Sequence, residues 1–297
     1  MHNSETLFSV VVPAYNRRQH IEKLISRFAA ISFMSWELLI VDDGSVDDTK
    51  SLFENNIDSR VKYVRQENKE RGAARNCGLK IATGKYVTFL DSDDYLKPEI
   101  FDEALKVINS NPGIPVFHLG YETRNSTDEI IRTADHLPDY LNDVLIERNV
   151  IACLGLFIDR NVALNFLFNE DRGLSGTEDY ELWIRLASHY PIKHFNITVA
   201  VLVEHEGRSM LDLNVEKTIK RIELFIQYSL SNPHTSKFLG ARKAKFIAFR
   251  YSYISLHAAL ASEKSVSISY LKKALVICPK LIFNKRFVVI VKKLILG

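Results

Sequence analysis

Short apolar runs alternate with helical periods over the first ninety residues. Four runs have the apolar, partly β-branched composition of buried strands: 8–12 (FSVVV), 37–41 (ELLIV), 61–64 (VKYV) and 86–90 (YVTFL). Between them, helical spacing or small residues predict helices over 19–31, 45–53 and 71–82. This strand–helix alternation predicts an α/β fold with a mostly parallel central sheet and flanking helices.

The rest of the chain is less regular and becomes helical after residue 209. The patterns predict helices over 98–108 and 176–190, and strands over 116–121, 130–133 and 197–203. Three further helical stretches follow, over 214–230, 237–262 and 266–296, the last with a break near Pro279. We therefore expect an α/β domain over 1–210 and a C-terminal helical appendage over 211–297.

Three of the predicted strands end in polar loops. These are PAYN (13–16), DDGS (42–45) and DSDD (91–94). The carboxyl ends of parallel strands meet at one edge of a sheet, and ligands bind outside that edge. We therefore expect the three loops to form a ligand site.

The third loop crowds carboxylates at the end of a buried strand. Asp91 and Asp93 lie two residues apart and can both face one point. Like charges repel and are costly to desolvate, and a divalent cation with oxygen ligands relieves both penalties. The alternative is a solvated turn in which Asp94 caps the next helix. The preceding strand and the two companion loops favour the cation.

Four other residues are candidates with plain structural alternatives. Asp43 can accept hydrogen bonds from a nucleobase or ribose, or the DDGS turn can simply lead into a capped helix. Arg75 can meet a phosphate or base, or its helix can be a closely packing small-residue face. Asp179 can serve as a general base at a helix start, or can only complement the macrodipole there. His205 follows a strand, and HEGRS is not the H-E-x-x-H motif of zinc proteases.

Missing motifs and composition exclude several protein classes. There is no P-loop, and no G-x-G-x-x-G follows the first strand, so a bound nucleotide would need another way to neutralise its diphosphate, and a metal ion on the D-x-D carboxylates supplies one. The three cysteines form no C-x-x-C pair, which argues against zinc and a disulfide framework and fits a reducing cytosol. A net charge of +3 gives no indication of nucleic-acid binding. We find neither a signal peptide nor a run of 18 apolar residues.

The last 33 residues differ in charge from the rest of the chain. Residues 265–297 contain seven lysines and arginines and no acid, interleaved with apolar stripes. Two interpretations stay open. The segment can pack on the catalytic domain with its lysines solvated, or it can contact an anionic membrane peripherally.

The order of the motifs resembles the family 2 inverting glycosyltransferases of the GT-A fold, of the bacterial cell-surface polysaccharide type. The motifs are FSVVVPAYNR, ELLIVDDGSVDDT, ENKERGAARNCGL, YVTFLDSDDYLKP, GTEDYELWIRLA and HEGRSM. They cover about Leu7 to Met210. Glu70 departs from the N-x-G pattern of many relatives.

The resemblance implies a role for each matching position. The nucleotide-sugar-binding residues would be Pro13, Ala14, Tyr15, Asp43, Arg75, Asp91 and Ser92, with the first three lining the base and Asp43 bonding it. Asp93, with His205, would ligate Mn²⁺ or Mg²⁺ beneath the diphosphate, and Asp179 would be the catalytic base.

The implied reaction moves a sugar from a nucleotide-sugar, with uracil the expected base, to a hydroxyl of a glycan or lipid-linked glycan. The expected location is the cytoplasm or the cytosolic face of the inner membrane. Two alternatives remain. A sugar-1-phosphate nucleotidyltransferase also uses carboxylate-bound metal, although PAYNRR lacks the glycines it would want. A catalytically inactive sugar-nucleotide-binding protein or scaffold would share the fold.

Overall fold

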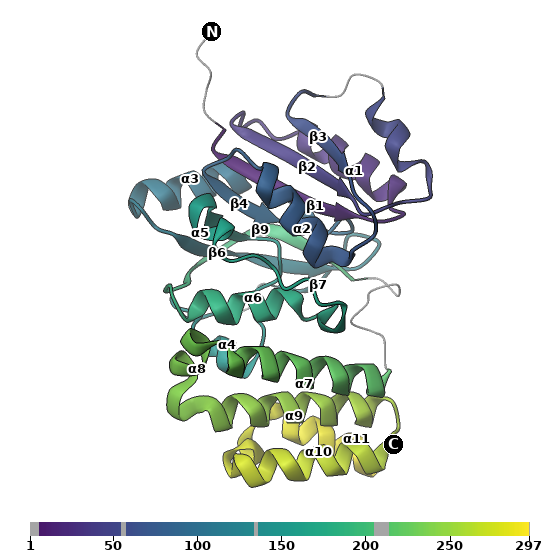
Figure 1. Cartoon of the computed structure of the whole chain (residues 1–297), viewed down its shortest axis with the longest axis vertical. Coiled ribbons are helices and arrows are strands. Elements are labelled where there is room, and N and C mark those ends of the chain that lie inside the picture. Colours follow the sequence, from purple (N-terminus) through teal and green to yellow (C-terminus); the bar gives the residue numbers. More distant parts are fainter. Residues whose placement is uncertain (1–5, 55–57, 134–135, 205–213, 297) are drawn as a thin grey trace. The chain divides into compact units, whose positions relative to one another are not determined.

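The computed structural model describes residues 6–54, 58–133, 136–204 and 214–296 (Figure 1). Its contacts divide the chain into two compact units. The α/β unit comprises Met1–Leu141, Ile151–Arg172 and Tyr190–His205. The helical unit comprises Asn142–Val150, Gly173–His189 and Glu206–Gly297. The domain limits 1–210 and 211–297 stay a prediction.

The α/β unit is built on one mixed sheet. In the described residues its nine strands are β1 (Phe8–Ala14), β2 (Trp36–Asp42), β3 (Val61–Arg65), β4 (Tyr86–Phe89), β5 (Tyr95–Leu96), β6 (Val116–Arg124), β7 (Ile130–Arg132), β8 (Leu156–Asp159) and β9 (Lys193–Val203). The order is β3-β2-β1-β4-β8-β6-β9-β5, and β7 pairs with β6. The pairs β1–β2, β2–β3, β1–β4 and β6–β9 are parallel.

The predicted α/β class with a mostly parallel sheet is confirmed, with two additions. The sequence patterns did not predict the short strands β5, which lies antiparallel to β9, and β8, which lies antiparallel between β4 and β6. Strand β8 joins the N-terminal parallel half of the sheet to the β6–β9 half.

Helices cover both faces of the sheet. Those of the α/β unit are α1 (Arg18–Ala29), the 3₁₀ helix η1 (Asp48–Phe53), α2 (Glu70–Ile81), α3 (Ile100–Ser110) and α5 (Arg160–Leu164). Alternate side chains of a strand point to opposite faces. Phe8, Val10 and Val12 share one apolar core with residues of α1 and α3. Val11 faces α2, where a Cβ at Gly78 would lie 2.3 Å from Val11 Cγ1.

Glu37 organises the amino end of the sheet. It is 2% exposed, and its Oε1 accepts hydrogen bonds from Ser9 Oγ at 2.6 Å and from the Thr83 amide at 2.6 Å. Its Oε2 pairs with Lys62 Nζ at 2.7 Å. This carboxylate ties the turn before β4 to β1 and β2, at the edge opposite the predicted site.

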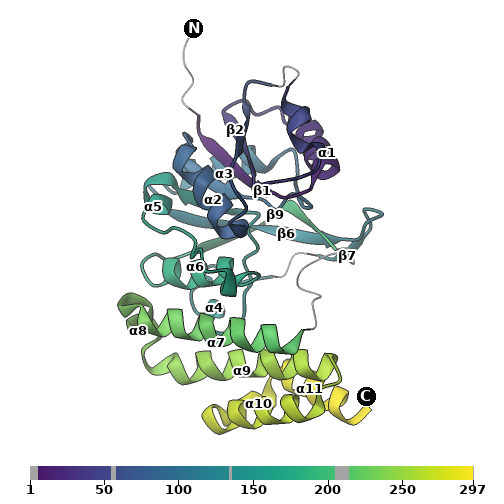
Figure 2. The same ribbon diagram turned by 45° about the vertical axis from the view of Figure 1, so that its right-hand side comes forward.

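The helical unit is a stack of helices, seen in both Figure 1 and Figure 2. It contains α4 (Val144–Glu147), α6 (Glu178–Ala187), α7 (Val215–Ser231), α8 (Pro233–Leu239), η4 (Gly240–Arg242), α9 (Lys243–Leu260), α10 (Lys264–Ile277), η5 (Pro279–Phe283) and α11 (Lys285–Leu296). Helix α9 packs against α4, α7, α10 and α11. None of the helices in the described residues is long and apolar enough to cross a membrane.

Two predicted helices differ from the structure. The helix expected over 237–262 is divided, because α8 ends at Leu239 and Gly240 has a φ of 47°. The helix expected over 45–53 is the shorter 3₁₀ helix η1, which Asp47 caps by accepting from the Thr49 amide.

Candidate active site

The loops after β1 and β2 form one hydrogen-bonded structure. The Asn16 amide donates to Ser45 Oγ at 2.9 Å, and Asn16 Oδ1 accepts from the Val46 amide at 2.8 Å. The Arg18 amide donates to Asp47 Oδ2 at 3.2 Å. The strands hold these loops at neighbouring carboxyl ends, as predicted from the parallel order.

Asp42, the first carboxylate of DDGS, shapes the loop from inside. It is fully buried, and its Oδ1 accepts from the Ser45 amide at 2.7 Å. Its Oδ2 accepts from Tyr63 Oη at 2.5 Å and from Arg65 Nη1 at 3.3 Å. Burial, together with the hydrogen bond to Asp42, raises the pKa of Tyr63 to about 12, so this phenol stays a proton donor at neutral pH.

Asp43 is held in place with one carboxylate oxygen to spare. It is 4% exposed, and its Oδ1 accepts from Gln66 Nε2 at 2.7 Å and from the Lys69 amide at 2.9 Å. Its Oδ2 makes no hydrogen bond within the described part of the chain. Gly44 has a φ of 84° and no room for a Cβ, which would lie 3.0 Å from the Asn68 amide nitrogen. The result is a preorganised acceptor.

The residues expected to line the base are split by exposure. Pro13 and Ala14 end strand β1 and are buried, so they form a floor rather than a contact surface. Tyr15 follows directly and is 48% exposed. An exposed aromatic ring beside a preorganised carboxylate suits stacking on a planar ligand.

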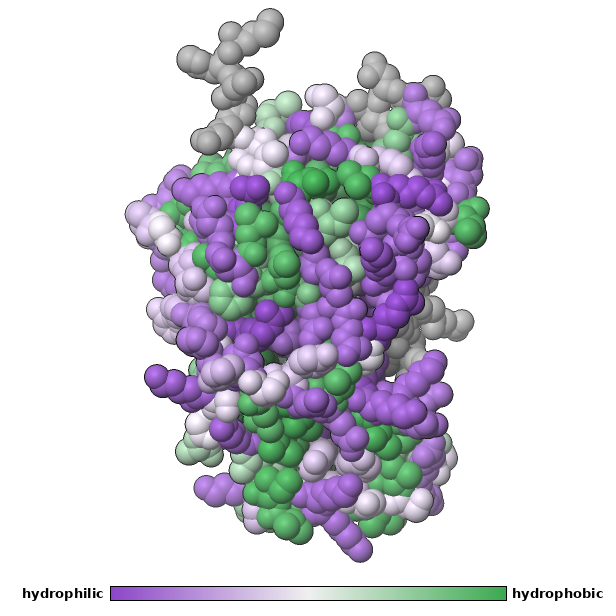
Figure 3. Space-filling view, viewed as in Figure 1, coloured by the Kyte–Doolittle hydropathy of each residue, from purple (hydrophilic) through white to green (hydrophobic). Residues whose placement is uncertain are grey.

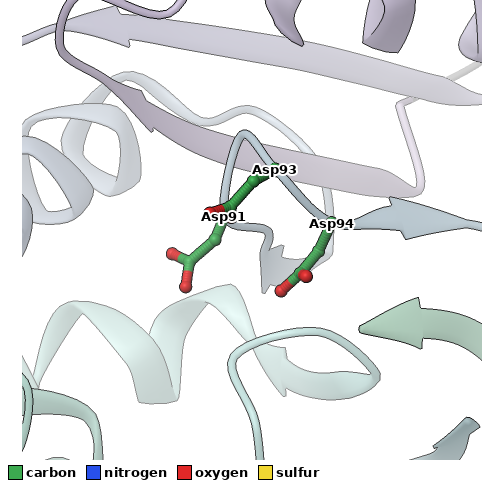
Figure 4. Close-up of side chains that lie close together, drawn as sticks. All are labelled: Asp91, Asp93 and Asp94. Carbon is green, nitrogen blue, oxygen red and sulfur yellow. The ribbon is translucent and has the colours of Figure 1, made fainter. Parts of the chain in front are cut away.

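The third loop brings three carboxylates together. Asp91, Asp93 and Asp94 leave the end of β4 on one turn, with ligand atoms all within 4.8 Å of one another. Figure 4 shows Asp91 and Asp94 directed to the same side of this turn. Asp94 is 3% exposed and its Oδ1 accepts from the Val203 amide at 2.8 Å, at the end of β9. It does not cap α3, which begins at Ile100.

Arg75 reaches this loop from helix α2. Its Nη2 lies 2.6 Å from Asp91 Oδ1, its side chain is 1% exposed, and its guanidinium lies 5.2 Å from the Phe168 ring centre. Part of the negative charge at this turn is therefore balanced by a buried cation of the protein itself. The sequence could not indicate this pair, because the two residues are 16 positions apart on different elements.

The donor set fits an oxygen-preferring divalent cation. All three side chains are carboxylates, whose hard oxygen atoms such cations prefer. A carboxylate oxygen has more than one lone pair, so an oxygen that accepts a hydrogen bond can still ligate a cation. Asp93 and Ser92 are both partly exposed at its tip.

Asp179 belongs to the helical unit, in the first turn of α6. The neighbouring Glu178 is 5% exposed and accepts from the Gly176 amide at 2.6 Å, so it shapes the helix start. Asp179 is partly exposed and its Oδ2 lies 3.3 Å from Asn149 Nδ2. Of the two acids, Asp179 is the more exposed. His205 lies outside the described residues.

Comparison with known proteins points to one family. Residues 9–153 match the model of Glycosyl transferase family 2. Over these residues the chain resembles that family. The matched region carries the β1, β2 and β4 loops and Arg75, and it ends before Asp179.

Several known proteins resemble this chain over much of its length. It is 29% identical to the UDP-Glc:α-D-GlcNAc-diphosphoundecaprenol β-1,3-glucosyltransferase WfgD of Escherichia coli, over 72% of this chain and 83% of WfgD. It is 27% identical to chondroitin synthase of E. coli, over 71% of this chain and 31% of the synthase. The chain spans 31–65% of the length of the first four curated relatives it matches.

A solved structure supports the fold. TarS 1–349 of S. aureus, in complex with UDP-GlcNAc, superposes with a TM-score of 0.63 over 90% of each chain. At 18% identity this likeness shows the GT-A-like fold alone.

Proposed function

We propose that this protein transfers a sugar from a UDP-sugar to a hydroxyl of a glycan or glycolipid, with inversion, in cell-surface polysaccharide synthesis. The observation that carries the proposal is the Asp91–Asp94 turn at the end of β4, inside the family-matched region. The names of WfgD, which gives a UDP-glucose donor, and of the UDP-GlcNAc complex of TarS support the choice of donor.

The donor is held by the α/β unit. Tyr15 stacks on the uracil ring, and Asp43 Oδ2 accepts from its imide, the one ring N–H that a fixed carboxylate can select. Asp91 and Ser92 face the ribose and phosphate. Arg75, being buried against Asp91, acts as a positioning residue that fixes the orientation of that carboxylate.

Asp93, with His205 as a further proposed ligand, would hold Mn²⁺ or Mg²⁺. When bound, the ion would act as a Lewis acid that balances charge on the diphosphate leaving group. Asp179 takes the proton from the acceptor hydroxyl as it attacks the anomeric carbon. One displacement inverts the configuration, so no protein nucleophile is needed.

Nucleotide release tests this proposal. UDP-glucose or UDP-GlcNAc with Mn²⁺ is expected to yield UDP, slowly when no acceptor is present. Asp93→Asn is expected to lose Mn²⁺ binding in a calorimetric titration as well as UDP release. Asp102→Asn, which neutralises an exposed acid of α3 outside the turn, is the matched control and should retain both.

Two results would contradict the proposal. Full UDP release in EDTA would remove the metal from the reaction. Formation of pyrophosphate from UTP and a sugar 1-phosphate would instead support a nucleotidyltransferase.

We also propose that the C-terminal helices contact an anionic membrane surface. Helices α10 and α11 and the η5 turn expose large apolar side chains: Val276 (84%), Phe283 (85%), Val288 (61%), Ile295 (73%) and Leu296 (72%). Six of the seven basic residues of this segment are exposed among them: Lys272, Lys273, Lys280, Lys285, Lys292 and Lys293. In Figure 3, apolar and hydrophilic side chains alternate over the helical unit.

The alternation suits a bilayer interface, where each basic residue near an anionic surface contributes about 1 kcal/mol. Vesicles with increasing phosphatidylglycerol are expected to sediment the protein, and Phe283→Ser with Lys292→Gln and Lys293→Gln should weaken this at least tenfold. Val46→Ser, at a position 85% exposed in the α/β unit, is the control. Sedimentation that is insensitive to lipid charge and to the triple variant would refute the membrane role.

A further inference from the structure

Three arginines of the helical unit come together without a carboxylate partner. Arg221 lies on α7, Arg250 on α9 and Arg286 on α11, and α9 packs against both other helices (Figure 2). Within the described residues, no carboxylate lies within ion-pair distance of any of the three. We call them the arginine cluster.

Arg250 is the most buried of the three arginines. It is 3% exposed, and its guanidinium carbon lies 4.6 Å from the ring centres of both Tyr180 and Phe246. Its Nη2 donates to the Ile146 carbonyl at 2.7 Å, while its Nε is buried without a hydrogen-bond partner. Aromatic faces and one carbonyl stabilise this cation, but they do not neutralise it.

Arg221 and Arg286 are partly exposed and approach from the neighbouring helices. Arg286 Nη1 donates to the Phe249 carbonyl and to Ser252 Oγ, both at 3.0 Å. Within the described residues Arg221 makes two long hydrogen bonds, at 3.3 Å to the Ser175 carbonyl and 3.5 Å to Thr218 Oγ1, and its Nε is buried with no partner there.

The Tyr253 hydroxyl lies close enough to all three arginines for their charges to affect its pKa. Burial raises the pKa of Tyr253, whereas Arg221, Arg286 and Arg250 oppose that shift and Asp179 adds to it. Its hydroxyl has no hydrogen-bond partner in the described part of the chain. One turn along α9, the His257 ring lies tilted against the Tyr253 ring with the ring centres 4.3 Å apart, and within the described residues its Nδ1 is buried with no hydrogen-bond partner.

Positive charge therefore accumulates around the hydroxyl of Tyr253, a side chain that is partly exposed. Burial, followed by the charge of Arg250, lowers the pKa of Arg286. Burial, followed by Arg221 and Arg286, lowers the pKa of His257. Backbone carbonyls accept hydrogen bonds from the guanidinium N–H groups, but they leave the positive charges of the arginines to repel one another. An oxyanion would both accept those hydrogen bonds and balance the charge, and its oxygens match the planar geometry of the guanidinium group.

We propose that the arginine cluster and the Tyr253 hydroxyl bind a phosphate or diphosphate group. The site lies in the helical unit, within electrostatic reach of Asp179, and it is separate from the Asp91–Asp94 turn of the α/β unit. It does not depend on the proposed transfer reaction. Two sources supply this chemistry, a free phosphate species and the diphosphate of a lipid-linked saccharide.

Binding of pyrophosphate to the full chain tests the site. The titration is run calorimetrically in EDTA and at constant ionic strength, so that no metal ion recruits pyrophosphate to the Asp91–Asp94 turn. Arg221→Gln is expected to weaken pyrophosphate binding at least tenfold, because it removes one charged partner. Tyr253→Phe keeps the ring and should weaken binding severalfold.

The matched control is Lys220→Gln. Lys220 precedes Arg221 on α7, carries the same charge and has a side chain that is 74% exposed. It should bind pyrophosphate like the wild type. Far-UV circular dichroism and the thermal midpoint without ligand establish that each variant is folded. Equal weakening by Lys220→Gln would indicate a diffuse charge effect and overturn the proposal, as would absence of binding to the folded wild type.

A second arm identifies the source. A short-chain alkyl diphosphate carrying N-acetylglucosamine is titrated in the same way. Binding at least tenfold tighter than pyrophosphate, and sensitive to Arg221→Gln, assigns the site to a lipid-linked saccharide. Similar affinity, also sensitive to Arg221→Gln, assigns it to free phosphate species.

Discussion

Gly78 in helix α2 provides a test in which two physical effects have opposite signs. Replacing an interior helical glycine by alanine favours the helix by about 1 kcal/mol when nothing else changes. Here the new Cβ would lie 2.3 Å from Val11 Cγ1 and 3.1 Å from Val41 Cγ2. Carbon atoms pack best about 3.5–4.0 Å apart, so helix and sheet would have to separate by more than about 1 Å.

The sheet has little room to yield. Val11 and Val41 are both 0% exposed, and β1 is held between β2 and β4. Overpacking of a dense core costs about 1–3 kcal/mol, and this contact is severe enough for the upper end. Subtracting the gain in helix propensity, we expect Gly78→Ala to lower the free energy of unfolding by about 2 kcal/mol.

Urea denaturation of a double-mutant cycle measures this effect. Val11→Ala alone should be destabilising, because it opens a cavity. In the Gly78→Ala background it should cost at least about 1 kcal/mol less, since it removes both methyl groups of Val11, including the one that the new Cβ would approach to 2.3 Å. Lys80→Ala, on the exposed side of α2, is the control and should change stability by less than about 0.5 kcal/mol.

Stabilisation by Gly78→Ala would refute the reasoning, because helix propensity would then outweigh packing. Additive effects of the two substitutions would also refute it, since the loss could not then come from this contact.

Three further predictions concern charge and the site. Burial raises the pKa of Glu37, but hydrogen bonds from Lys62 and Ser9 outweigh this effect, so the pKa in the folded protein is lower than the ordinary value of 4.5. The contribution of Glu37 to the free energy of unfolding is therefore complete above pH 4.5, and it is lost as the pH falls through the pKa of the folded protein. Glu37→Gln should flatten the pH dependence of urea unfolding in that acidic range, and an unchanged slope would assign it to other acids. Asp179→Asn should lower turnover at least ~10²-fold with UDP affinity retained, and loss of UDP affinity instead would make Asp179 a binding residue. Tyr15→Ala should weaken UDP binding at least about tenfold, corresponding to 1–3 kcal/mol of stacking, while Tyr15→Phe should retain it; equal loss in both would assign the effect to the hydroxyl.

The sequence was most informative where local pattern and burial agree. Strands β1, β2 and β4 were predicted because runs such as FSVVV are apolar on both faces and stop at polar loops. Strand β8 was not, because its four residues gain strand character from neighbours on both sides rather than from their own pattern. The division at Gly240 was missed for a similar reason, since the flanking residues are ordinary helix formers.

For the candidate site, too, the sequence predicted the position of the loops but not the contacts that depend on packing. That the three loops follow neighbouring strands was predictable from the parallel topology. That Arg75 balances Asp91, and that Asp42 is buried by Tyr63, depends on how α2 and β3 pack against the sheet. Sequence motifs name the residue types, but only packing separates a carboxylate that shapes a loop from one that offers an oxygen to a ligand.

The interleaving of the two units bears on how this chain can be made and recombined. Asp179 sits on a helix whose packing partners come much later in synthesis, since α6 contacts α7 and Tyr180 lies against Phe225. A ribosome that has released residues up to 210 has therefore exposed an apolar helix face with nothing yet to cover it. A chimera joined at that point would inherit the segment with the proposed base Asp179 from one parent and its supporting helices from the other. Productive exchange between relatives is expected only where the α6 segment and the C-terminal helices are transferred together.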